Sequence, residues 1–194
     1  SSKRKKVVLN ILVDALSWQA MKEQNYALLP NTMKFFSKGV IFNQHFSVAE
    51  YTFPSLTTIE AGIYTHKSQV FNDAVNMPLA PEYKVLSEQM RDLGYYCVNI
   101  MGCPSLHYTG AGRGYDRQII NSYAQRVYEG VERTIQQLEA FGECDQFLLL
   151  HVLDVHPWPV NMISMPVASQ TCLSLEDRLW QTKEKVASVK LKYS

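Results

Sequence analysis

Three short apolar runs constrain the fold of this chain more than any other feature. They cover residues 7–13, 95–101 and 146–153. Nearly continuous apolar runs of this length are typical of strands that are buried on both faces, as in a parallel sheet covered by helices. We therefore predict that these three runs are central strands of one sheet.

Helical patterns separate the predicted strands. They are expected at residues 33–38, 55–62, 82–93, 122–141 and 174–191. A further short strand is expected at residues 40–46, and after the helix expected at 174–191 the chain reaches Ser194 without another strand. Strands that alternate with helices predict an α/β fold with a mostly parallel sheet flanked by helices. The abrupt end predicts that this sheet is incomplete at its C-terminal side.

The overall composition is that of a globular protein. The chain has 194 residues, of which 46% are hydrophobic and 19% are charged, and this length suits a single domain, 1–194. The formal net charge is +1, so no global field favours nucleic acid as a partner. No apolar run is long enough to cross a membrane.

Cysteine usage and the N-terminal residues bear on location. The four cysteines form no CxxC pair, and we interpret them as buried thiols of a reducing compartment. Asn10 and Asp14 interrupt the first apolar run, which therefore does not resemble a secretory leader. A cytoplasmic location is favoured for the chain as given, with a periplasmic or extracellular one open if a leader or anchor has been removed.

Residues 50–64 form the most informative segment for function. Pro54 suits the first turn of a helix, and Leu56, Ile59 and Ile63 are spaced to form one apolar face. Thr52 would then stand at the positive end of that helix, where backbone N–H groups favour an anion. Its hydroxyl has two interpretations, a helix cap or a nucleophile.

Other candidate residues follow the predicted strands, because ligands of open α/β sheets bind beyond the carboxyl ends of strands. Asp14 ends the first strand, and Asp154 and His156 follow the third. A cap at Asp14 and a loop-orienting role for Asp154 are the alternatives. His156, beside an aromatic residue in a loop, suits an anion contact.

Several remaining residues have structural interpretations. His151 lies within an apolar run and is expected to be a hydrogen-bonded core histidine, whereas His45 and His66 are expected at the surface. His66 is nevertheless close in sequence to the helix that follows Thr52. The glycines of residues 110–114 have neither the spacing nor the context of a nucleotide loop, so we predict a flexible turn there.

The ordered set of these motifs resembles the N-terminal part of the sulfatase branch of the alkaline phosphatase superfamily. The resemblance rests on a strand ending at Asp14, then Thr52-Phe-Pro-Ser, a segment from Thr58 to His66, Gly114-Tyr-Asp, and His151-Val-Leu-Asp-Val-His-Pro. It implies a divalent metal ion (Zn, Mn, Ca or Mg) bound by Asp14 and Thr52. It also implies that Thr52 is the nucleophile and that His156, together with His66, contacts a small anionic ester substrate.

Four departures from the family pattern limit this resemblance. Sulfatases carry Cys or Ser at the nucleophile position, converted to formylglycine, whereas Thr52 cannot form that aldehyde; an arginine is replaced by Leu56. A threonine is more similar to the phosphodiesterases, phosphoethanolamine transferases and lipoteichoic acid synthases of the superfamily. Ser68 replaces a second histidine, and no Asp-His-Gly metal segment follows Pro159.

Two hypotheses from different classes remain. The first is a metal-dependent hydrolase or transferase that acts on phosphate or sulfate esters through Thr52, this chain being the N-terminal portion of the catalytic domain and inactive alone. The second is a non-catalytic sulfatase-like scaffold that binds an anion or a partner. A nucleotide-binding domain is disfavoured because there is no phosphate loop. The sequence leaves the substrate, the metal and the oligomeric state open.

Overall fold

The computed structural model describes residues 5–16, 21–22, 27, 29–71, 78–101, 109–120 and 127–153. The chain divides into two compact units, which we describe separately. The first unit comprises Ser1–Leu12 and Phe46–Val152, and it holds the sheet and most helices. The second unit comprises Val13–His45 and Leu153–Ser194, and its described helix is α1 (Pro30–Phe36).

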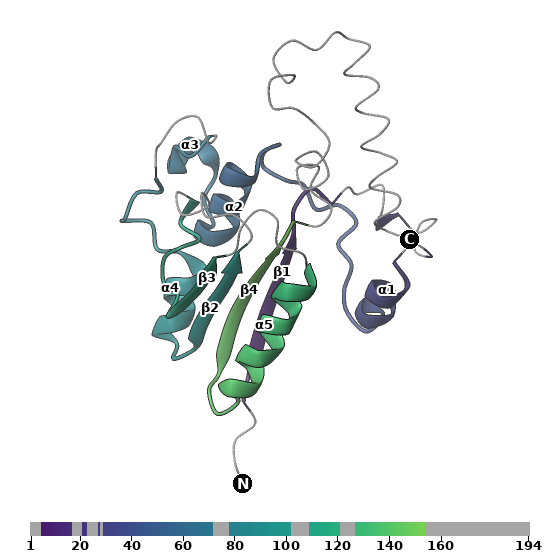
Figure 1. Cartoon of the computed structure of the whole chain (residues 1–194). Helices are drawn as coiled ribbons and strands as arrows, with labels where there is room; N and C mark the ends of the chain where they lie inside the picture. The colour runs from purple at the N-terminus through teal and green to yellow at the C-terminus, as the bar shows by residue number, and fades with distance from the viewer. Residues whose placement is uncertain are drawn as a thin grey trace, which may run out of the picture. The chain divides into compact units, whose positions relative to one another are not determined.

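The first unit is built on a four-stranded sheet with the order β1-β4-β2-β3 (Figure 1). Its strands are β1 (Val7–Val13), β2 (Tyr96–Met101), β3 (Arg117–Ile120) and β4 (Gln146–Val152). The central strand β2 pairs in parallel with both β4 and β3. The Gln146 amide donates a hydrogen bond to the Lys6 carbonyl at 2.9 Å, so β1 and β4 begin side by side. The predicted parallel α/β sheet is confirmed.

Among the described residues of the first unit, four helices accompany the sheet. They are α2 (Thr52–Ala61), α3 (Thr65–Ser68), α4 (Leu86–Asp92) and α5 (Val127–Ala140). The helices predicted at 33–38, 55–62 and 82–93 are thus present with shifted ends, and the helix predicted at 122–141 is present over its described part. The helix predicted at residues 174–191 lies outside the described residues.

Two strand predictions were inaccurate. Residues 40–46 form turns and irregular chain rather than a strand, and Phe42 there is 73% exposed. Strand β3 was not predicted, because its four residues begin with Arg117 and Gln118 and carry no apolar alternation. Parallel pairing with β2 supplies the backbone hydrogen bonds that make this short polar segment a strand.

The core lies on both faces of β2 and β4. Alternate residues of a strand point to opposite sides of the sheet, so each strand contributes side chains to both faces. On one face, Cys97, Phe147 and Leu149 pack with Leu86 and Met90 of α4. On the other face, residues such as Val98 and Leu148 are completely buried. Helix α5 packs on β4 and β2 (Figure 1). Helices therefore cover the two sides of the central strands, as the apolar runs predicted.

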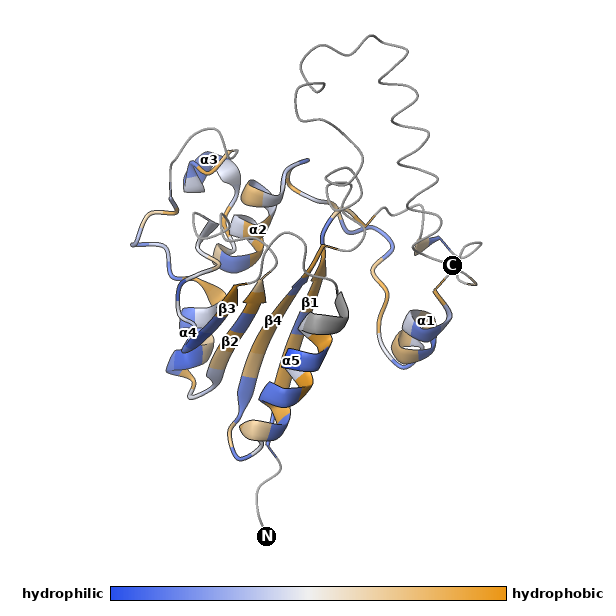
Figure 2. Cartoon of the chain, in the orientation of Figure 1, coloured by the Kyte–Doolittle hydropathy of each residue, from blue (hydrophilic) through white to orange (hydrophobic). Residues whose placement is uncertain are grey.

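Strand β1 differs from this prediction because it is largely exposed. Leu12 packs on the α4 face of the sheet, so Val7, Leu9 and Ile11 point to the opposite face, where they are 51%, 39% and 50% exposed. On α5, Val131 and Ile135 are also exposed, while the buried positions include Thr134 and Gln137. Figure 2 shows the apolar colour running along β1. We call the exposed residues Val7, Leu9, Ile11, Val131 and Ile135 the apolar flank.

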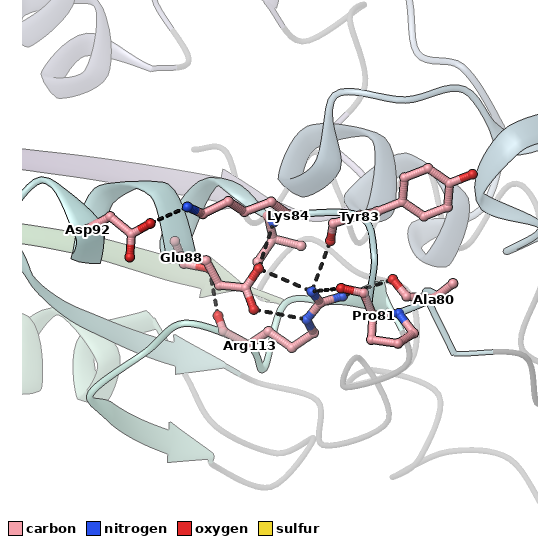
Figure 3. Close-up of polar contacts among 9 residues, drawn as sticks. Ala80, Pro81, Tyr83, Lys84, Glu88, Asp92 and Arg113 are labelled. Atoms are coloured by element: carbon pink, nitrogen blue, oxygen red, sulfur yellow. Dashed lines mark hydrogen bonds and ion pairs between the residues drawn. The ribbon is translucent and has the colours of Figure 1, made fainter.

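An arginine joins the segment before β3 to the start of α4. Arg113 donates hydrogen bonds to both carboxylate oxygens of Glu88, at 3.2 and 3.1 Å, and to the carbonyls of Ala80, Pro81 and Tyr83 (Figure 3). Glu88 in turn accepts the Val85 amide, which caps the first turn of α4. The turn at residues 110–114, predicted to be flexible, is therefore held by specific bonds.

Candidate active site

Thr52 is the first residue of α2, and the preceding Tyr51 occupies the N-cap position in an extended conformation. The first helical bond runs from the Ser55 amide to the Tyr51 carbonyl at 3.3 Å. The expected N-cap role therefore falls to the Tyr51 backbone rather than to Thr52. The Thr52 side chain is partly exposed. A hydroxyl in this position stands beside the backbone N–H groups of the first turn, which favour negative charge.

The chain leading into α2 is held by two serines. The hydroxyls of Ser47 and Ser55 lie 3.1 Å apart, and both donate to the Ala49 carbonyl. At the other end, Gly62 adopts a left-handed conformation with φ +67°, and its amide donates to the Thr58 carbonyl. A left-handed glycine is a common helix stop. Both ends of the helix that carries Thr52 are therefore defined by local hydrogen bonds.

The buried face of α2 is more polar than the sequence pattern predicts. Ile59, expected on the apolar face with Leu56 and Ile63, is 53% exposed, whereas Thr57 and Glu60 are almost fully buried. Leu56 and Glu60 are four residues apart and so share one side of the helix. The prediction that the side containing Ile59 is buried was wrong. The side containing Glu60 is buried instead, because Glu60 has a hydrogen-bond partner inside the unit.

That partner is Tyr115, whose hydroxyl donates to Glu60 Oε1 at 3.2 Å. Burial raises the pKa of Glu60 from 4.5 to about 7, while the Tyr115 hydroxyl and the nearby Ser87 oppose the rise. The pKa of Tyr115 is also raised, first by burial and then by the neighbouring Glu60 charge. A buried acid that titrates near neutral pH therefore lies on the same helix as Thr52.

Asp14 is in the turn directly after β1, in the second unit. The following Ala15 has φ +60°, and the Leu16 amide approaches the Val13 carbonyl at 3.4 Å, so the chain reverses sharply at this point. Asp14 is partly exposed. The prediction that a carboxylate ends the first strand is thus confirmed as a matter of position, and its role stays a prediction.

The histidines differ in position. His66 is exposed on α3, which follows the C-terminal end of α2, and its ring stacks on Tyr64 with centroids 6.1 Å apart. His151 is 5% exposed on β4, as expected for a core histidine. His156 and Asp154 lie outside the described residues. The roles of His66 and His156 in binding substrate stay predictions.

The predicted metal ligands are Asp14 and Thr52, which belong to different units of the chain. A carboxylate and a hydroxyl are oxygen donors of the kind that Mg²⁺, Ca²⁺ and Mn²⁺ prefer and that Zn²⁺ accepts. Within the described ranges, no three His, Cys, Asp or Glu residues come together. Each of the two residues therefore suits a divalent cation in chemical type, and a metal site that they share stays a prediction.

Sequence reasoning missed Glu60 and Tyr115. The four-residue spacing between Leu56 and Glu60 was a signal for one shared face, but Ile59 and Ile63 offered a more apolar alternative. Tyr115 was recognised only as part of a Gly-Tyr-Asp motif. In the structure, Asp116 of this motif accepts the Cys97 amide at 2.8 Å and donates its own amide to the Cys97 carbonyl. The motif attaches the segment before β3 to the sheet.

The architecture defines a class of protein. A parallel sheet flanked by helices matches the fold of alkaline phosphatase and sulfatase-like proteins. The sequence model of the sulfatase family matches residues 6–169 of this chain, so the chain belongs to the sulfatase family. The comparison with curated proteins gave no match.

Solved structures share this fold at low sequence identity. A putative sulfatase from Bacteroides thetaiotaomicron is 16% identical with a TM-score of 0.67, and the match covers 98% of this chain and 52% of that protein. An alkaline phosphatase superfamily protein from Vibrio parahaemolyticus is 14% identical with a TM-score of 0.61, and the match covers 98% of this chain and 49% of that protein. The phosphonate monoester hydrolase of Agrobacterium radiobacter is 18% identical with a TM-score of 0.59, and the match covers 80% of this chain and 42% of that protein. The chain thus spans about half the length of these structures.

The described helices also bear on membrane attachment. Within the described ranges, no helix has the length and apolarity needed to cross a lipid bilayer.

Proposed function

We propose that the protein is a hydrolase or transferase of phosphate or sulfate esters that uses Thr52 as its nucleophile. The observation that carries this proposal is the position of Thr52 at the first residue of α2, within a chain of the sulfatase family. Phosphonate hydrolysis by one structural neighbour and the putative sulfatase activity of another support both ester classes as candidates.

The proposed reaction has two transfers. The Thr52 oxygen forms a bond to the phosphorus or sulfur atom as the bond to the ester oxygen breaks, and the threonine proton ends on the departing alcohol. Water, or the hydroxyl of an acceptor, then takes the group from Thr52 and restores its hydroxyl. The positive end of α2 would stabilise the anionic oxygens during both transfers. His66 and His156 are proposed contacts for these oxygens.

Asp14 and Thr52 would hold a divalent cation in this proposal. When bound, such an ion would supply charge neutralisation and a lower pKa for a coordinated hydroxyl. Threonine as the unmodified nucleophile favours phosphate over sulfate esters, because sulfatases of the family act through formylglycine. We therefore propose a phosphate ester as the preferred substrate class. A non-catalytic anion-binding scaffold is the rival hypothesis.

The test uses the longest polypeptide that contains this chain, assayed with p-nitrophenyl phosphate, bis(p-nitrophenyl) phosphate and p-nitrophenyl sulfate. Thr52→Ala should lower kcat by roughly a thousandfold or more, since the covalent step is lost. Thr58→Ala is the matched control: it removes a threonine hydroxyl from the same helix, one that donates to the Ile63 carbonyl. A phosphoryl group trapped on Thr52 by acid quench would support the mechanism. Equal activity of Thr52→Ala and wild type would refute it.

A further inference from the structure

Glu60 is a buried carboxyl group that the proposed chemistry does not use. It is 3% exposed, on the face of α2 that also buries Leu56 and Thr57. Burying a carboxyl group is costly unless hydrogen bonds compensate. Only one of its oxygens has a hydrogen-bond partner among the described residues, and that partner is Tyr115. A leucine or valine would fill such a position at lower cost, so the carboxyl group calls for an explanation.

Tyr115 is itself firmly attached to the sheet. Its ring stacks on Phe147 of β4, with centroids 6.3 Å apart, and the side chain is 8% exposed. The next residue, Asp116, exchanges two hydrogen bonds with Cys97 of β2, each 2.8 Å long. The bond from Tyr115 to Glu60 therefore connects α2 to the two central strands of the sheet rather than to a loose loop.

Helix α4 provides a second connection. Ser87 is completely buried, donates its hydroxyl to the Arg113 carbonyl at 2.6 Å, and lies close enough to Glu60 to favour the carboxylate through its backbone amide. Helix α2 therefore contacts α4 as well as the pre-β3 segment. The hydrogen bond from the pre-β3 segment reaches Glu60, near the C-terminal end of α2.

The other end of α2 carries Thr52. Glu60 is the eighth residue after Thr52, which corresponds to a distance of roughly 12 Å along a helix axis. A helix moves as a stiff body, so a small change of angle at Glu60 displaces Thr52. Misplacement of a reacting group by about 1 Å can cost roughly a hundredfold in rate. The carboxyl group is therefore well placed to control the position of the hydroxyl.

We propose that Glu60 is a positioning residue, which through Tyr115 orients α2 so that Thr52 meets the substrate. This inference rests on the proposed function, because it gives Thr52 the role of nucleophile. Glu60 does not touch the substrate. Its contribution is to the placement of the reacting oxygen, so its loss should lower kcat more than it raises KM.

The experiment compares Glu60→Gln, Glu60→Leu and Tyr115→Phe in the longest polypeptide that contains this chain, with bis(p-nitrophenyl) phosphate as the probe. Glu60→Gln retains an oxygen that accepts the Tyr115 hydroxyl, so it should stay within about threefold of wild type. Glu60→Leu and Tyr115→Phe should each lower kcat by roughly 10- to 100-fold, with KM changed less than about threefold. The control is Thr134→Val, which removes a buried hydroxyl from α5 that donates to the Gly130 carbonyl.

Hydrogen exchange of the α2 amides provides a readout that does not depend on activity. Glu60→Leu and Tyr115→Phe should speed exchange in α2 and leave α5 unchanged, whereas Thr134→Val should do the reverse. Wild-type kcat and wild-type α2 exchange in Tyr115→Phe would overturn the proposal, even if Glu60→Leu failed to fold. If Thr52→Ala kept full activity, the proposed function would fail, and the exchange data alone would still decide whether Glu60 positions α2.

Discussion

Arg113 and Glu88 form a two-point ion pair across 25 residues of sequence, with Nε and Nη2 of the arginine on the two carboxylate oxygens. Both side chains are largely buried, with 26% and 20% of their surface exposed. Bidentate pairs of this kind are stronger and more specific than single contacts. The pair connects the pre-β3 segment, which carries Tyr115, to the first turn of α4.

Replacing Arg113 should therefore destabilise the first unit. Arg113→Ala leaves Glu88 and three backbone carbonyls without their donor, and we expect a loss of about 2–3 kcal/mol in the free energy of unfolding. Arg113→Lys should recover only part of it, because lysine cannot bond both oxygens in one plane. The control, Lys84→Ala, breaks an ion pair with Asp92 in which both side chains are 55% exposed, and it should lower the urea midpoint much less than Arg113→Ala does. Urea unfolding measures all three.

Two glycines with similar backbone angles should respond differently to alanine. Gly114 has φ +74°, and a Cβ there would lie 2.4 Å from the Glu88 nitrogen. Gly62 has φ +67° with no atom within 4 Å of the added carbon. Gly62→Ala should therefore cost only the left-handed conformation, about 1–2 kcal/mol. Gly114→Ala should cost clearly more, because backbone has to move. Similar midpoints for the two variants in urea would show that the packing between Gly114 and α4 is looser than described.

Glu60 should make stability depend on pH in a defined direction. Its pKa is about 7 in the folded protein and 4.5 without burial, so between these values the folded state holds a proton that the unfolded state has lost. The contribution of Glu60 to the free energy of unfolding is largest below pH 4.5. It falls as the pH rises to about 7, by about 3 kcal/mol in total. Glu60→Gln lacks this loss. Relative to wild type, it should therefore gain thermal stability between pH 5 and pH 8.

Thermal melts of both proteins at the two pH values measure this gain, since the contributions of other groups cancel in the comparison. Glu139→Gln, at an exposed position of α5, is the control and should show no gain. A constant difference between Glu60→Gln and wild type across this range would mean that Glu60 stays charged in the folded protein.

Metal dependence should be traceable to Asp14. Treatment of the active polypeptide with a chelator should abolish hydrolysis of p-nitrophenyl phosphate, and one of Zn²⁺, Mn²⁺, Mg²⁺ or Ca²⁺ should restore it. Asp14→Asn keeps the shape but loses the charge of the ligand, so the metal concentration for half-maximal activity should rise by roughly tenfold or more. Isothermal calorimetry with the restoring metal tests binding separately from activity. Unchanged metal affinity in Asp14→Asn would remove Asp14 from the site.

The strands were predictable from the sequence where both faces are buried. Strand β4 is apolar at every position except Gln146 and His151, and its seven residues are all buried. Strand β1 has the same kind of sequence and was predicted equally well as a strand, but its burial was not. An apolar run indicates that its side chains favour burial. Whether they are buried depends on residues elsewhere in the chain, which the run itself does not reveal.

The candidate site was predicted in part. Local sequence patterns were enough to predict two positions, that of Thr52 at the start of a helix and that of Asp14 after β1. The burial of Glu60 depends on Tyr115, which is 55 residues away. Local periodicity carries no information about such a distant partner, so the more apolar face containing Ile59 was preferred. The strand predicted at residues 40–46 was wrong for the same reason. Its apolar residues suggested burial in a sheet, but no local pattern shows whether a partner strand lies beside them, and in the structure these side chains are exposed.

The apolar flank also determines how the protein must be handled at the bench. An edge strand that displays valine, leucine and isoleucine is a template on which a strand of another molecule can assemble. Val131 and Ile135 of α5 add further exposed apolar area, and concentration during purification would bring these apolar residues into contact with other copies of the protein. Dilute storage, and a Lys in place of the half-exposed Leu9 or Ile11, should therefore keep the protein in solution long enough for its chemistry to be measured.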